Sequence, residues 1–150
     1  MYKLIKKIIL PILMFTASIA VAYEQDFNIS IRLRSPISIT VIQELLFPDV
    51  VLSGTDFNLI VQSTDVNAAS FISSGGKNRT ITTSIVPPTI YLTAPGILGS
   101  IKVDSFTVFG PSAFDSVGNA SFKVGATASI LASSEDADYS GFAIFRVVYQ

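Results

Sequence analysis

Apolar and polar residues alternate with a period of two along much of the chain beyond residue 23. In residues 27–33, polar side chains separate four apolar ones, Phe27, Ile29, Ile31 and Leu33. This spacing is typical of a β-strand that buries one face. The alternation resumes after Pro36, and proline cannot donate a hydrogen bond to a β-ladder. Residues 26–42 are therefore predicted to form two strand segments joined at this proline.

The last stretch, residues 139–150, has apolar side chains on both of its alternating faces. Phe142, Ile144 and Val148 lie on one side, and the other side carries Ala143, Phe145, Val147 and Tyr149. A strand that is apolar on both faces usually lies centrally between packed layers. We therefore expect residues 139–150 to form a central strand around which the rest of the chain is organised.

Further short apolar runs lie between these two regions, separated by turn residues. Residues 68–72 and 80–86 flank the pair Gly75-Gly76, which predicts a β-hairpin. Further strands are expected at residues 50–52, 57–61, 89–93, 100–109, 121–124 and 126–131. Roughly nine to eleven strands spaced by about 8–12 residues, without helical periodicity, favour one antiparallel β-sandwich or barrel.

The first 22 residues have the features of a secretory signal peptide. Lys3, Lys6 and Lys7 precede an apolar stretch at residues 8–19, and Ala20-Val21-Ala22 fits a small-x-small cleavage site. We expect cleavage after residue 22, leaving residues 23–150 as a single domain. The alternative is an uncleaved membrane anchor, but the apolar run is shorter than the ~20 residues that a spanning helix needs. The protein is predicted to be exported to the periplasm, the cell surface or the medium, with no membrane span after cleavage.

Composition narrows the possible partners and stabilising devices. The chain contains no cysteine, so its stability cannot depend on disulfides or on thiolate metal sites. Seven basic and eleven acidic residues remain after residue 22, which gives a net charge of −4. Because no basic cluster is present to follow a phosphate backbone, nucleic acid is not expected as a partner.

The residue types also argue against an enzyme. Histidine is absent, which excludes Ser-His-Asp triads and the common zinc sites, and no Gly-x-Ser-x-Gly elbow occurs. Glu135, Asp136 and Asp138 form the densest carboxylate group, to which a distant Asp115 could add a calcium ligand. A solvated turn is the interpretation we favour for them. No catalytic, cofactor-binding or metal-binding residue is assigned.

Several short motifs occur in an order that resembles the bacterial family called domain of unknown function 4402 (DUF4402). They are Pro36-Ile37-Ser38-Ile39, Leu45-Leu46-Phe47, Ala68-Ala69-Ser70-Phe71 before Gly75-Gly76, Phe122-Lys123-Val124-Gly125-Ala126-Thr127, and the aromatic pattern from Tyr139 to Tyr149. Pro48 departs from the pattern, which commonly has glycine there. The resemblance implies an exported, immunoglobulin-like β-sandwich of the bacterial envelope. It brings no known activity and no site residues.

Residues 27–33 suggest a way in which such a domain could assemble. An alternating arm is suited to lying in a neighbour's groove as an added strand. The terminal strand with its penultimate Tyr149 resembles that of chaperone–usher pilins, in which a neighbour's arm completes an incomplete sandwich. The first hypothesis is therefore a pilin-like structural subunit, with copies of itself or related subunits, and a periplasmic chaperone, as partners.

Three alternatives remain open at this point. Residues 27–33 could be the first strand of a complete sandwich within one chain. The protein could be a monomeric secreted or periplasmic binding domain that uses the loops at residues 73–78, 111–119 and 133–138. It could also be a small outer-membrane β-barrel, although the expected strands are shorter than the ~9–11 residues that span a membrane.

Overall fold

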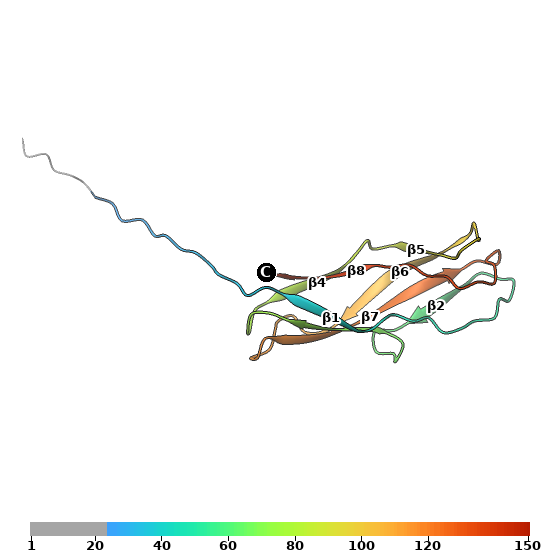
Figure 1. Ribbon diagram of the computed structural model, residues 1–150, viewed down its shortest axis with the longest axis horizontal. Helices are drawn as coiled ribbons and strands as arrows, with labels where there is room; N and C mark the ends of the chain where they lie inside the picture. The colour runs from blue at the N-terminus through green and yellow to red at the C-terminus, as the bar shows by residue number, and fades with distance from the viewer. Residues whose placement is uncertain (1–23) are drawn as a thin grey trace, which may run out of the picture. The chain divides into compact units, whose positions relative to one another are not determined.

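The computed structural model describes residues 24–150, so the predicted signal peptide at residues 1–22 lies outside the described residues (Figure 1). Leu33–Gln150 form one compact unit, and the described residues 24–32 do not belong to it. Residues 24–32 belong to no strand, and their side chains are exposed. Over the part of the chain that the structure describes, no helix is long and apolar enough to cross a membrane.

The second unit is built entirely from antiparallel β-strands. One sheet has the order β1-β3-β7-β6-β5, with β2 also paired to β7, and the other consists of β4 and β8, which run side by side in Figure 1. The strands are β1 (Ser38–Gln43), β2 (Phe57–Val61), β3 (Ala69–Ser74), β4 (Ile81–Val86), β5 (Ile90–Thr93), β6 (Ser100–Phe109), β7 (Asn119–Ile130) and β8 (Ile144–Tyr149). The predicted all-β antiparallel sandwich is confirmed.

The central strand is β7, which has twelve residues. It pairs with β3 and β2 along one edge and with β6 along the other. The predicted break at Gly125 is wrong, because β7 runs through it. A side chain at Gly125 would meet the backbone carbonyl of Val61 and the amide of Ser63. The glycine therefore allows the chain to leave β2 close against β7 before it returns as β3.

The inner face of the large sheet carries two core clusters. The first lies between β7, β4 and β8 and is formed by Ile81, Phe114, Ala120, Phe122 and Val147. The second, toward the far end of β7, is formed by Ile101, Val103, Ala126, Ala128 and Ile130. Leu45, Phe47 and Tyr139 cover this second cluster from segments outside the strands. The two-stranded sheet therefore contributes only to the first cluster.

The predicted hairpin at Gly75-Gly76 is wrong. β3 pairs with β1 and β7, whereas β4 pairs with β8, so residues 75–80 carry the chain from one sheet to the other. A Cβ on Gly75 would lie 2.6 Å from Cε2 of Phe114 and 2.7 Å from the hydroxyl of Tyr149. This glycine serves a close approach between segments and not a hairpin turn.

The expectations for the two ends of the domain also need correction. The terminal strand is shorter than residues 139–150, and among the described residues it pairs along only one edge, with β4. Residues 24–37 form no strand, and β1 starts after Pro36, at Ser38. The predicted strand at residues 50–52 is absent from the structure as well. The C-terminal strand is therefore an edge strand and not the centre of the fold.

Candidate strand-acceptor groove

The smaller sheet has only two strands, β4 and β8, so each of them has an outer edge that the other does not pair with. Its strands are joined by a continuous ladder from Ile81↔Tyr149 to Val86↔Ile144. Within the described residues, no strand pairs with the opposite edge of β8. Unpaired edges with free N–H and C=O groups are templates for another strand. The outer edge of β4 is partly occupied, because Ile81 donates its backbone N–H to the carbonyl of Ser112 at 2.9 Å. The open edge of β8 is therefore the candidate site for an added strand.

The register shows which backbone groups of β8 point to its open edge. Gln150 donates its backbone N–H to the carbonyl of Thr80 at 3.2 Å, which makes this a hydrogen-bonded pair. Hydrogen-bonded and non-hydrogen-bonded pairs alternate along an antiparallel ladder. Phe145, Val147 and Tyr149 therefore direct their backbone N–H and C=O groups away from β4, toward the open edge.

The inner face of β1 lies uncovered beside this edge. In the ladder with β3, Ile39 is opposite Ser73 and Val41 is opposite Phe71. Directly opposite residues share a face, and Phe71 packs against the first core cluster, so Ile39 and Val41 face inward. Nevertheless, 38% of Ile39 and 57% of Val41 is exposed.

The packing of β8 explains this exposure. Phe145 of β8 stacks on Phe71 of β3 with ring centroids 4.5 Å apart, and it also contacts Phe122 of β7 at 5.3 Å. β8 therefore lies over β3 and β7 and does not cover β1. We call the resulting site the β8–β1 groove, defined by the open edge of β8 and the side chains of Ile39, Val41, Phe71 and Phe145.

One end of the β8–β1 groove is closed by the chain's own residues. The hydroxyl of Tyr149 accepts the N–H of Gly76 at 2.6 Å and donates to the carbonyl of Ser35 at 2.8 Å. The guanidinium of Arg34 lies 5.4 Å from the centroid of the Tyr149 ring and donates to the carbonyl of Gln150 at 3.2 Å. Residues 34 and 35 therefore occupy the space at the Tyr149 end.

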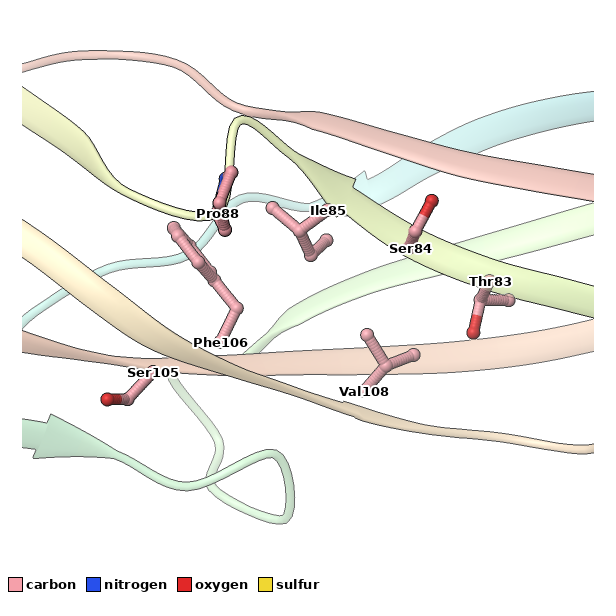
Figure 2. Close-up of a pocket in the computed structure, with 7 residues that line it drawn as sticks. All are labelled: Thr83, Ser84, Ile85, Pro88, Ser105, Phe106 and Val108. Atoms are coloured by element: carbon pink, nitrogen blue, oxygen red, sulfur yellow. The ribbon is translucent and has the colours of Figure 1, made fainter.

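A hollow of about 380 Å³ lies on the other side of the narrow sheet, between β4 and β6. In Figure 2, the side chains of Ile85, Pro88 and Phe106 point toward one another across it. Ile85, Phe106 and Val108 are partly buried, and Pro88 is exposed. The apolar lining of this hollow is thus mostly partly buried, whereas the more exposed inward-facing apolar residues, Ile39 and Val41, lie in the β8–β1 groove.

The structure places the predicted arm residues outside any strand. Phe27, Ile29, Ile31 and Leu33 are 78–83% exposed. It does not bring these four side chains into a core, and their polar neighbours are exposed as well. Ile39 and Val41, by contrast, lie in the alternation that was expected to resume after Pro36. Nothing in their local sequence shows that the opposite sheet stops short of them.

The acidic residues form no metal site in the structure. In residues 24–150, no group of three or more potential metal ligands comes together, and this includes Glu135, Asp136 and Asp138. The carboxylate of Asp115 accepts backbone N–H groups from Val117, Gly118 and Asn119 at 2.8, 2.7 and 2.8 Å. These hydrogen bonds, that from Asn119 above all, lower the pKa of Asp115. Asp115 is therefore a turn residue at the start of β7.

Fold and groove together define an antiparallel β-sandwich domain with an unpaired strand edge beside an exposed apolar face. The family model described as Domain of unknown function (DUF4402) matches residues 49–149. The chain belongs to this family, as its motifs suggested. Comparison with curated proteins and with solved structures finds no match.

Proposed function

We propose that this protein is a non-enzymatic, exported structural subunit that assembles by strand addition. Residues 27–33 of one copy lie along the open edge of β8 in the β8–β1 groove of another. The observation that carries the proposal is the exposed inner face of β1 beside an edge strand whose Phe145, Val147 and Tyr149 backbone groups have no ladder partner among the described residues. A strand placed there would complete both.

The arm has the side chains that the groove requires. Its apolar residues recur at every second position, so all four can face the groove while Asn28, Ser30 and Arg32 face solvent. Burial of one such large apolar side chain stabilises a complex by roughly 1.5–3 kcal/mol. Main-chain hydrogen bonds to an edge strand supply affinity, and alternate side chains in pockets supply specificity. Both contributions are available here.

An uncovered edge also implies a need for protection before assembly. Exposed strand edges with apolar neighbours promote uncontrolled aggregation. We therefore propose that a periplasmic chaperone covers the β8–β1 groove after export and is displaced by the arm of the next subunit. The predicted signal peptide at residues 1–22 is consistent with this route.

The test compares two double variants of the full-length protein, purified after export. Ile29→Asp with Ile31→Asp places two charges on the apolar face of the arm, and Asn28→Asp with Ser30→Asp adds the same charges on its polar face. We expect filaments in electron micrographs and denaturant-resistant multimers for the wild type and the polar-face variant. The apolar-face variant is expected to remain a folded monomer by circular dichroism and sedimentation.

Two results would contradict the proposal. One is a wild-type protein that stays monomeric at every concentration and never forms denaturant-resistant species, which would favour a monomeric binding domain. The other is assembly of the apolar-face variant to the same extent as the polar-face control. Deletion of residues 24–34 gives a further check, because the remaining domain should fold and should not multimerise.

A further inference from the structure

We infer that the added strand runs antiparallel to β8 and enters the β8–β1 groove at the Ile144 end, so that subunits join head to tail in an open chain. This inference rests on the proposed function and concerns the direction of the same interaction. It follows from which end of the groove is free, from the alternation of the arm, and from the position of Arg146.

The Tyr149 end of the groove is occupied in each subunit. There, Ser35 accepts the hydroxyl hydrogen of Tyr149 and Arg34 lies over its ring. A donor strand running parallel to β8 would bring its own residues 34–36 to this same end. These residues and the folded domain that follows them would collide with the acceptor's residues 34 and 35, whereas an antiparallel donor brings only its short segment 24–26 past this end. An antiparallel strand instead carries the donor's Leu33 and the domain that follows it toward Ile144.

The opposite end of β8 offers room for the donor's domain. Residues 141–143 belong to no strand, and Phe142 is 87% exposed. Ile144, the first residue of β8, is 56% exposed. Two large apolar side chains therefore face solvent at the point where the donor chain would leave the groove, and contact with the donor would cover them.

Alternation, charge and the open-edge backbone groups of Phe145, Val147 and Tyr149 together select the register. The inward side chains of the arm have odd numbers, as do those of β8, and directly opposite residues must share a face. One such register places Arg32 across from Arg146, where like charges repel. Shifting by two residues places Ser30 across from Arg146 instead. Phe27, Ile29 and Ile31 then lie opposite the three β8 residues whose backbone groups face the open edge.

Direction decides the form of the assembly. If each arm entered a partner at the Tyr149 end, two subunits could exchange arms reciprocally and close into a dimer. Entry at the Ile144 end leaves the donor's own groove free for a third subunit. Such a heterologous contact continues into a filament unless its rotation closes a ring. The antiparallel direction therefore predicts polymers of increasing length.

Engineered disulfides can read out the direction because the chain contains no cysteine. In the selected register, Asn28 lies opposite Val148 in a non-hydrogen-bonded pair, where Cα atoms are about 4.5 Å apart and disulfides form readily. We expect Asn28→Cys with Val148→Cys to give a ladder of covalent oligomers under mild oxidation. The matched control, Arg32→Cys with Val148→Cys, should show no more cross-linking than Val148→Cys alone.

The alternative outcomes separate this inference from the proposed function. A covalent dimer of the control pair would show a parallel, reciprocal exchange and overturn the direction while leaving strand addition intact. A fast-migrating covalent monomer of the control pair would show that the arm lies in its own groove. Wild-type assembly without a cross-link in either pair would overturn the direction and register. Monomers throughout, in the wild type as well, would overturn strand addition itself.

Discussion

At the residue scale, Tyr149 connects three segments that are far apart in sequence. Its hydroxyl joins the N–H of Gly76 to the carbonyl of Ser35, and its ring packs edge-on against Phe114 with centroids 6.0 Å apart. It thereby fixes the point at which the arm leaves the domain. This position explains why a penultimate tyrosine has a structural role in a strand that is otherwise paired on one side only.

Tyr149→Phe should destabilise the domain and release residues 34 and 35. The variant keeps the ring but loses one accepted and one donated hydrogen bond, and the Gly76 N–H loses its partner. We expect a loss of about 1–3 kcal/mol in the free energy of unfolding, measured by urea denaturation. Tyr139→Phe is the control, because the Tyr139 hydroxyl makes a single 3.2 Å bond to the carbonyl of Glu135 at an exposed site. Equal urea midpoints for the two variants would contradict this role.

The turn before β7 depends on the charge of Asp115. Its carboxylate accepts three backbone N–H groups, and these hydrogen bonds lower its pKa below the ordinary value for aspartate. A carboxyl group whose pKa is lower in the folded state stabilises the fold above its unfolded pKa, near 3.9. This contribution is lost as the pH falls through the lower folded pKa. The β3–β7 end of the sandwich should therefore be acid-sensitive.

Asp115→Asn should reduce the acid sensitivity of the melting temperature. The amide oxygen of asparagine can still accept backbone N–H groups but does not titrate. Between pH 5 and about pH 3, we expect a steeper fall in melting temperature for the wild type than for the variant, with the wild type more stable at pH 7. The Lys102–Asp104 pair, which also lowers a carboxyl pKa, is common to both proteins. Parallel curves over this range would refute the assignment.

At the element scale, the sequence predicted strands best where one face is buried and the other is exposed to solvent. β2 and β6 lie where alternation placed them, because period-two burial produces that pattern directly. A register shift between Asp104 and Thr107 interrupts the ladder of β6 with β7. The residue ranges of β2 and β6, and their assignment as strands, therefore follow from the local alternation of apolar and polar residues.

Strand partners could not be predicted in the same way. The pair Gly75-Gly76 has hairpin chemistry, yet its glycines admit Phe114 and Tyr149, which are distant in sequence. The terminal strand is apolar on both faces, which indicates burial but does not distinguish a core from a surface that awaits a partner. Its outward residues Ile144 and Val148 are exposed. For the same reason, the alternation of residues 27–33 predicted a candidate arm, whereas no local pattern predicted the groove, which β1 and β8 form only after folding.

At the scale of the whole molecule, one chain carries both an alternating segment that belongs to no sheet and a sheet edge that no strand of the described residues occupies. The arm precedes Leu33, where the folded unit begins, and the groove lies within that unit. If strand addition is correct, the folded unit alone binds the arm as a separate ligand. A ligand that binds only the native state stabilises it by RT ln(1 + [L]/Kd).

A protein that begins at Leu33 should therefore be stabilised by a synthetic peptide of residues 24–34. We expect its melting temperature to rise with the logarithm of peptide concentration. At a peptide concentration of a hundred times Kd, the free energy of unfolding should increase by about 2.7 kcal/mol. A peptide with aspartate in place of Ile29 and Ile31 is the control and should produce no shift. Retaining Arg34 and Ser35 keeps the Tyr149 end closed, so binding would also show that the groove accepts a strand while that end is occupied. A flat response to both peptides would mean that the exposed face of β1 serves something other than this arm.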